Sequence, residues 1–492
     1  MKKMVKAIAL SAAVLTLFAA NASAKKADKA AKPAKEKAAK PAKDKPVKKT
    51  KFDQKGFDAA YAGRDYAACA GMLLGKNNDK TLVKDLLDAD MLIYLAKNYQ
   101  ESGKGFLEAY GKMQETTAEM TGGKGLAAAL GGENALKYYG AEYERYLAWS
   151  MRLVNAFNSN QSDVAQGVMK DYTGTFMAEI QALRAQNDEM EKGAEAALSS
   201  KEFNDAVKIL EEGKINLGIS AMLKGRPAKS KEKYEDSAFF NYLGTLAYAV
   251  NGDFDHAADF ANLKKVRGAS AFTKAPAGAG HLEVVALSGL IGKRTDAGDN
   301  TQPTSVTFAV PQVMKTVTLY TKLAYPEFKA QKHAINGVKI TLSNGASAQA
   351  ALIENFDEAV RIDVAQKAYG AYCRSIFRNV LKNSVATGSI LASGAAMQAA
   401  AGNPITAKAA EIAFDKAVDA AAEALVSIEK ADIRQGEYFP HKASAAGFDV
   451  EPGTYTVTVE YLNGSDIVDT KTIENVVVEE GKVNVAVSAC ER

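Results

Sequence analysis

Cysteine is scarce in this chain, with 3 in 492 residues. The three, Cys69, Cys373 and Cys490, lie far apart in the sequence. An odd number of widely separated cysteines does not build the disulfide framework of a small secreted domain, although one pair with a leftover thiol remains possible. The sequence therefore gives no reason to expect a fold held together by disulfides.

Histidine is almost as rare, and familiar catalytic motifs are missing. The 4 histidines are His256, His281, His333 and His441. No two of them have the spacing of metal ligands, so we expect no metal and no cofactor. HExxH, GxSxG and CxxC are absent, so we do not expect an enzyme. An envelope hydrolase, with two carboxylates far apart in the sequence, is the least favoured function.

One glycine-rich segment, GLIGK at Gly289–Lys293, has part of a phosphate-binding loop. Such a loop needs a glycine five positions before the Gly-Lys pair, and Leu287 stands there. Nucleotide binding is therefore not predicted.

The first residues have the order of a secretory signal peptide. Lys2, Lys3 and Lys6 precede an uncharged apolar run, and Ala22-Ser23-Ala24 follows it. The apolar run is about 14 residues long, whereas a helix that spans a bilayer needs roughly 20. We predict a signal peptide at residues 1–24, cleaved after Ala24. No cysteine lies near the cleavage site, so the protein is not expected to be a lipoprotein.

A basic segment follows at Lys25–Lys51, built almost entirely of Lys, Ala and Pro. It has 12 Lys and 3 acidic residues and no large apolar side chain, which predicts a disordered tether. Subtracting its net charge of +9 and the 3 Lys of the signal peptide from the net +4 of the chain leaves −8 for residues 52–492. The tether is either a spacer or an arm for peptidoglycan or anionic lipid; nucleic acid is not an expected partner.

Residues 52–270 are predicted to form a helical domain. Apolar residues recur three and four apart, and Pro227 is the only proline between Lys51 and Gly268. Turn signals are GRDYAA from Gly63, GKGFLEA from Gly103, NQSDVA from Asn160, KEFNDA from Lys201 and GDFDHA from Gly252. The last signal, with Gly244 before it, resembles a tetratricopeptide repeat (TPR). We predict an irregular TPR-like α-helical array, with a generic helical bundle as the alternative.

Aromatic residues form a stripe in this region. Helical spacing predicts Tyr139, Tyr143 and Tyr146 on one face, which Trp149 continues. Such a stripe either lines a groove for a peptide or glycan or packs between helices, and packing is the favoured interpretation. These four residues are candidate structural or partner contacts.

Residues 276–492 are predicted to form a β-rich domain. Strands are expected at residues 282–287, 305–310, 316–321, 338–342, 447–450, 454–461, 469–478 and 483–487. Asn463-Gly464 predicts a hairpin turn after the clearest strand. A helical insertion at about 347–430 interrupts the strands. The fold class is thus multidomain α+β, a TPR-like α-helical array followed by an antiparallel β-sandwich-like domain with a helical insertion.

Within the insertion, residues 383–407 carry no charge. Small residues dominate this stretch and give little hydrophobic drive for membrane insertion. We favour a buried or mobile helical hairpin over a membrane segment.

Three segments are similar to a family of uncharacterised bacterial exported proteins, many of them lipoproteins. They are YERYLAWSMRLVNAF from Tyr143, GHLEVVALSGLIGKR from Gly280 and EKADIRQGEYFP from Glu429. The resemblance implies a TPR-like helical N-terminal half, a C-terminal mixed β domain and a hairpin at GLIGK, but no activity. This chain has Gly436 where family members often have Trp.

Asp432 and Arg434, in the A-D-x-R run of the third segment, are further candidate contacts. We favour an ion pair that joins the helical insertion to the β domain over a ligand site. The function most consistent with these features is an exported periplasmic or cell-envelope scaffold or adaptor, which binds envelope proteins through its helical array. The alternative is a structural protein that binds peptidoglycan or anionic lipid through the basic arm and the β domain.

Overall fold

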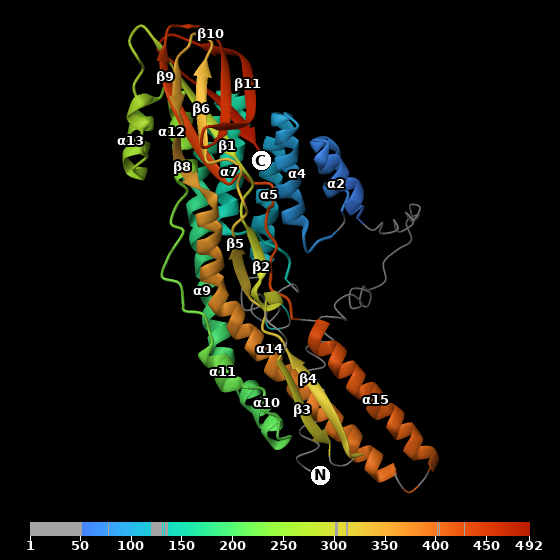
Figure 1. Ribbon diagram of the computed structural model, residues 1–492. Helices are drawn as coiled ribbons and strands as arrows, with labels where there is room; N and C mark the ends of the chain where they lie inside the picture. The colour runs from blue at the N-terminus through green and yellow to red at the C-terminus, as the bar shows by residue number, and fades with distance from the viewer. Residues whose placement is uncertain are drawn as a thin grey trace, which may run out of the picture.

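The computed structural model describes residues 52–492, except residues 77, 120–129, 131, 133–135, 301–303, 311–312, 401, 403 and 428. The predicted signal peptide and tether, residues 1–51, lie outside the described residues. In the described part, a helical N-terminal region precedes β-sheets that are interrupted by a long helical insertion (Figure 1). The architecture is therefore multidomain α+β.

Helices make up the N-terminal region as predicted. They are α2 (Gln54–Ala62), α3 (Tyr66–Leu74), α4 (Leu82–Leu95), α5 (Tyr99–Glu119), α7 (Glu142–Asn158), α8 (Ser162–Asp171), α9 (Met177–Ala197), α10 (Lys201–Glu212), α11 (Ile219–Lys224), α12 (Ala238–Ala249) and α13 (Phe254–Lys264). Short polar side chains start several of them. Asp65 accepts a hydrogen bond from the N–H of Ala68 in α3, and Ser237 accepts one from Phe240 in α12.

Four of the five predicted turns coincide with helix boundaries, those at Gly63, Asn160, Lys201 and Gly252. The turn predicted at Gly103 is wrong, because GKGFLEA lies inside α5. Gly105 in this segment packs against α4, where a Cβ atom would overlap the Asp90 carboxylate. The glycine therefore permits a close approach of two helices instead of a change of direction.

The strands form two four-stranded sheets and two ribbons, in the orders β12-β1-β9-β8, β11-β10-β6-β7, β2-β5 and β3-β4. They are β1 (Gly280–Ser288), β2 (Lys293–Asp296), β3 (Thr304–Val310), β4 (Lys315–Thr321), β5 (Pro326–Lys329), β6 (Gly337–Leu342), β7 (Ser347–Gln349), β8 (Ala351–Asn355), β9 (Lys442–Val450), β10 (Gly453–Asn463), β11 (Asp466–Val478) and β12 (Val483–Cys490). The predicted hairpin at Asn463-Gly464 joins β10 to β11.

The first sheet is mixed, whereas the sequence predicted an antiparallel arrangement. β1 runs antiparallel to β9 but parallel to β12. β12 enters this sheet from β11, which belongs to the other sheet. Since no hairpin ties β12 to β1, nothing forces the two strands to run in opposite directions.

The helical insertion begins later than predicted. Residues 347–355 form β7 and β8, and the insertion consists of α14 (Phe356–Ala400) and α15 (Pro404–Ser427). β8 pairs with β9, so tertiary pairing overrides the low strand propensity of its alanine. Residues 383–407 span the end of α14 and the start of α15, a helical hairpin. None of the helices in the described residues has an apolar stretch long enough to cross a membrane.

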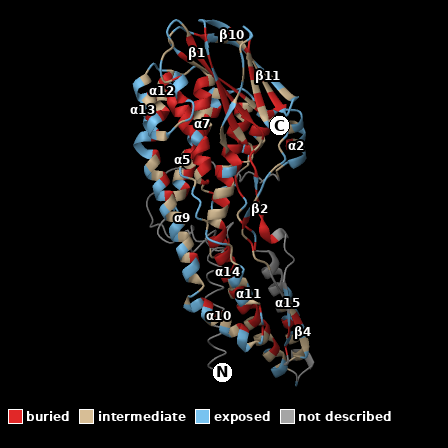
Figure 2. Ribbon diagram, turned by 60° about the vertical axis from the view of Figure 1, so that its left-hand side comes forward, coloured by how far each residue is buried: buried red, intermediate tan, exposed pale blue. Residues whose placement is uncertain are grey.

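The first sheet lies between the helices and the second sheet. Every residue of β1 is buried. Leu282, Val284 and Ala286 face the second sheet, whereas Val285 and Leu287 belong to the core that includes the helices. The helical and β-rich parts thus share a core that crosses the predicted boundary near residues 270–276 (Figure 2).

A second core lies along the far half of α14. This helix has 45 residues, which at 1.5 Å per residue makes it about 68 Å long. Helices α10, α11 and α15 and the β3–β4 ribbon gather around it, away from the two main sheets (Figure 1). Phe203, Phe308, Ile376 and Phe414 are buried there. The molecule is therefore elongated, with α14 connecting its two ends.

Candidate functional site

A cleft of about 290 Å³ lies between α9, α14 and the chain that follows α11. Tyr139, Glu142 and Asn187 line it from the N-terminal half, and Lys367 and Asp432 line it from the C-terminal half. Its walls therefore come from segments that are far apart in the sequence.

The charged groups of the cleft balance one another. Six basic and six acidic side chains line it. Arg184 is paired with Glu142, with Nε 3.1 Å from both carboxylate oxygens. Arg294 donates to Asp363 at 2.7 Å, and Lys367 lies 2.8 Å from the same carboxylate. The cleft thus has a lining of mixed polar and apolar groups without a strong charge of either sign.

The aromatic stripe divides between this cleft and the core. Tyr143, Tyr146 and Trp149 lie in α7 and are buried, since each residue is at most 2 % exposed. Tyr146 and Trp149 both make edge contacts with Phe176. Tyr139 precedes α7 and is therefore not on its face; it lines the cleft, where its hydroxyl donates to Asn187 at 3.3 Å. Packing accounts for three of the four residues, and only Tyr139 is placed to meet a partner.

Asp432 and Arg434 form the expected ion pair. Arg434 Nε and Nη2 donate to the two oxygens of Asp432 at 2.7 and 2.8 Å. The same guanidinium donates through Nη1 to the carbonyls of Lys80 and Leu136, at 2.7 and 2.8 Å. Arg434 therefore attaches its segment to the N-terminal helical region, whereas the sequence predicted a link between the insertion and the β domain.

The extended segment at residues 429–439 continues this attachment. Gly436 donates its N–H to Glu144 at 2.6 Å, and Glu437 donates its N–H to Asp88 at 2.6 Å. A Cβ atom on Gly436 would lie 2.6 Å from the Phe439 ring, so a tryptophan at this position does not fit without rearrangement. Buried acids of the helical region thus hold the segment through its backbone.

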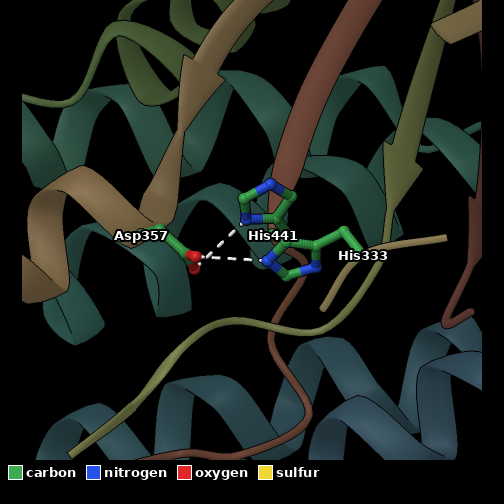
Figure 3. A group of neighbouring side chains, drawn as sticks. All are labelled: His333, Asp357 and His441. Atoms are coloured by element: carbon green, nitrogen blue, oxygen red, sulfur yellow. Dashed lines mark hydrogen bonds and ion pairs between the residues drawn. The ribbon is translucent and has the colours of Figure 1, made fainter. Parts of the chain in front are cut away.

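A second constellation joins His333, Asp357 and His441 (Figure 3). His333 lies in the loop between β5 and β6, Asp357 in the first turn of α14 and His441 directly before β9. His333 Nε2 is 3.2 Å from one Asp357 oxygen, and His441 Nδ1 is 3.1 Å from the other. In the described residues, no other three His, Cys, Asp or Glu side chains have ligand atoms that all lie within 4.8 Å. Spacing along the sequence did not indicate this candidate metal centre.

The turn at GLIGK wraps around this cluster. Gly292 donates its N–H to Asp357 Oδ1 at 2.6 Å. At Gly289, which has a φ of +69°, a Cβ atom would lie 3.1 Å from His441 Cβ and 3.2 Å from His333 Nδ1. The turn follows a strand as the resemblance implied. However, β2 pairs with β5 and not with β1, so the segment connects two sheets instead of forming a hairpin.

The surroundings set the charges of the cluster. Burial would raise the pKa of Asp357, but the contacts with His441 and the N–H of Gly292 outweigh burial and hold this pKa below its usual value. Burial and the neighbouring His441 lower the pKa of His333. At neutral pH, Asp357 is therefore ionised and His333 is neutral.

A series of polar contacts centred on the buried His281 runs from exposed Asp449 in β9 to α12. Its Nδ1 lies 2.7 Å from Asp449, and its Nε2 lies 2.9 Å from Glu283. Glu283 in turn accepts a hydrogen bond from the hydroxyl of Tyr242 in α12. None of these hydrogen-bonded residues lines the cleft. Their contacts link α12 to the first sheet.

The three cysteines are free and buried in three different clusters, so none forms the disulfide that the sequence left open.

Comparisons of the chain with models of protein families, with curated proteins and with solved structures gave no significant match. The resemblance to exported proteins therefore stays a prediction from the quoted segments.

Proposed function

We propose that this chain is an exported cell-envelope scaffold or adaptor that binds an extended segment of a partner protein in the cleft beside α9. The observation that carries the proposal is the cleft itself, a space of about 290 Å³ with walls from both halves of the chain. Export rests on the signal-peptide pattern of residues 1–24.

The proposal that the helices form a TPR-like array rests on close packing at small residues. A Cβ atom on Gly244 in α12 would lie 2.7 Å from Met169 and 3.0 Å from Phe260. The small residue thus lets α12 approach both α8 and α13, as TPR helices approach each other. We also propose that the two four-stranded sheets, which share an apolar core, form the sandwich-like part of the fold.

The lining of the cleft suits a peptide of mixed composition. Balanced charges do not select a strongly acidic or basic ligand. Tyr139 and the paired ions offer hydrogen-bonding groups at the rim of the space. An extended backbone carries donors and acceptors along its whole length, so it can use such a lining without a single dominant contact.

Site-specific photo-crosslinking tests this proposal. A photoreactive amino acid replaces Asp188, an exposed residue that lines the cleft, or Glu189, the next residue of α9, which is exposed but outside the cleft. We expect position 188, and not position 189, to give an adduct with one defined envelope protein. Identical products from both positions, or an adduct with peptidoglycan instead of protein, would overturn the proposal.

Attachment to an anionic surface is the second candidate, and the charge distribution favours it. The basic arm at residues 25–51 has a net charge of +9, against −8 for residues 52–492. Sedimentation with anionic liposomes or peptidoglycan tests it, with a variant that lacks residues 25–51 as the comparison. Binding that neither this deletion nor salt weakens would exclude the electrostatic role.

A hydrolase is the third candidate, because Glu142 and Asp363 both line the cleft. Burial raises the pKa of Glu142; burial also acts on Asp363, but Lys367 and Arg294 outweigh it and lower the pKa of this group. Opposite shifts in one cleft are typical of an acid and base pair. An arginine holds each carboxylate, which argues against this role. Absence of glycan release from peptidoglycan would exclude it.

A further inference from the structure

We propose that His333, Asp357 and His441 form a binding site for a divalent transition metal of the zinc class. Two imidazoles and one carboxylate are a donor set that Zn²⁺ uses with a water molecule as fourth ligand. The site is independent of the cleft, because none of the three residues lines it.

The spacing of the donor atoms fits this class of metal. Ligands that lie about 2.0–2.1 Å from a tetrahedral ion are about 3.3 Å from one another. In the cluster, His333 Nε2 lies 3.2 Å and His441 Nδ1 lies 3.1 Å from the Asp357 carboxylate. Both histidine-to-carboxylate separations are therefore already close to the value that the metal requires.

Two of the ligands are held in place by the fold. The N–H of Gly292 fixes one oxygen of Asp357, and the start of α14 stabilises its negative charge. The backbone of His441 is tied to β1, since its N–H donates to Ser288 at 3.0 Å. His441 is 5 % exposed, and its Nδ1 lies 3.1 Å from Asp357 without the geometry of a hydrogen bond. A metal between the two groups would give this buried nitrogen a well-directed bond.

His333 is the ligand that must move. The His333 and His441 rings stack with their centroids 3.3 Å apart and 9° between their planes. A metal lies in the plane of an imidazole that binds it, so two parallel rings cannot both bind one ion. His333 is 16 % exposed and lies in a loop, which provides both the freedom to rotate and a path for the ion. The charge of Lys442 next to His441 opposes the metal in part.

A cluster without metal is the competing interpretation. In that case Asp357 only pairs with the two histidines, and these pairs stabilise the junction of β9 with α14. The two interpretations differ in whether added metal stabilises the protein, and in whether that effect depends on all three side chains.

Metal titration of the purified full chain without a polyhistidine tag tests the proposal. The probes are Zn²⁺ in calorimetry and Co²⁺ in visible absorption. We expect one site per chain, the absorption of tetrahedral Co²⁺ and a rise in the melting temperature on adding Zn²⁺. His333→Ala and Asp357→Asn should each weaken binding on the order of 100-fold or more and abolish the temperature shift.

His256→Ala is the matched control, because His256 is an exposed imidazole beside the carboxylate of Asp253. It should leave all three signals unchanged. Since His333 is partly exposed, its variant should fold, and circular dichroism checks this. Binding that is absent in the full chain, or equal in the His333→Ala and His256→Ala variants, would overturn the proposal.

Discussion

Arg378 and Glu429 form an ion pair in the interior, with Nε of the guanidinium 3.1 Å from Oε1 of the carboxylate and side-chain exposures of 1 % and 0 %. Lys382, one turn further along α14, contacts the same carboxylate. Ser375 donates a hydrogen bond to it at 3.1 Å. The Glu429 carboxylate therefore balances the positive charges of Arg378 and Lys382. This cluster lies where the segment at residues 429–439 follows the helical insertion.

Replacing Glu429 by Gln should strongly destabilise the protein. The change removes the buried carboxylate that both Arg378 and Lys382 contact, which costs about 3–5 kcal/mol. Urea unfolding measures the loss. Glu411→Gln is the control, because Glu411 pairs with Lys408 on the surface of α15 and should contribute less than about 1 kcal/mol. Equal effects of the two changes would contradict the role of the buried cluster.

Arg434→Lys tests whether the segment at residues 429–439 is attached through the planar guanidinium. Lysine keeps the charge but loses the two-pronged contact with Asp432 and one or both bonds to the carbonyls of Lys80 and Leu136. We expect a loss of about 2–4 kcal/mol in unfolding free energy. Arg361→Lys, at an exposed pair with Glu358, should have little effect. A loss no larger than that of Arg361→Lys would contradict the attachment.

Asp90 is a buried carboxyl group whose replacement should stabilise the fold. Burial, with Glu108 and Glu101 nearby, raises its pKa to about 8, and Oδ2 has no hydrogen-bond partner. The Asp90 carboxyl group therefore holds its proton more tightly in the folded than in the unfolded state, so the free energy of unfolding falls as pH rises from about 4 to 8. Asp90→Asn should remove this pH-dependent loss of stability.

The gain should be on the order of 1–3 kcal/mol at pH 8 and should shrink towards pH 4. Unfolding experiments at both pH values measure it. Asp79→Asn, at an exposed position, is the control. A gain that does not depend on pH would show that Asp90 is not protonated in the folded protein.

His281 should also lower the stability of the fold as pH rises, because its pKa is raised in the folded state as well. Burial disfavours its charged form, but the contacts with Glu283 and Asp449 outweigh burial and raise its pKa. The imidazolium therefore stabilises the fold fully below about pH 6.5, and this contribution is lost as pH rises through the folded pKa. The difference in unfolding free energy between wild type and His281→Gln should shrink as pH rises above about 6.5. A constant difference would contradict a charged His281.

Local patterns were enough to predict much of the fold. Alternating apolar residues located β1, β10 and the hairpin at Asn463-Gly464. The patterns failed where distant packing decides the structure. Gly105 allows the close contact with Asp90 and does not start a turn. Residues Ala351–Asn355 become the strand β8 because they pair with β9.

The candidate sites show the same division. The ion pair of Asp432 with Arg434 connects neighbours in the sequence, so the A-D-x-R run indicated it. The partners of Arg434, Lys80 and Leu136, come from the other half of the chain and have no local signal. His333, Asp357 and His441 lie on three separate elements, and only the turn at GLIGK brings a sequence feature near them.

The most direct test of the metal site is a crystal structure of the full chain grown with Zn²⁺, with anomalous scattering recorded on both sides of the zinc absorption edge. We expect one strong anomalous peak between His333 Nε2, His441 Nδ1 and the Asp357 carboxylate, with the His333 ring turned out of its stack. Stacked rings without a peak at this position, or a peak only at exposed His256, would contradict it.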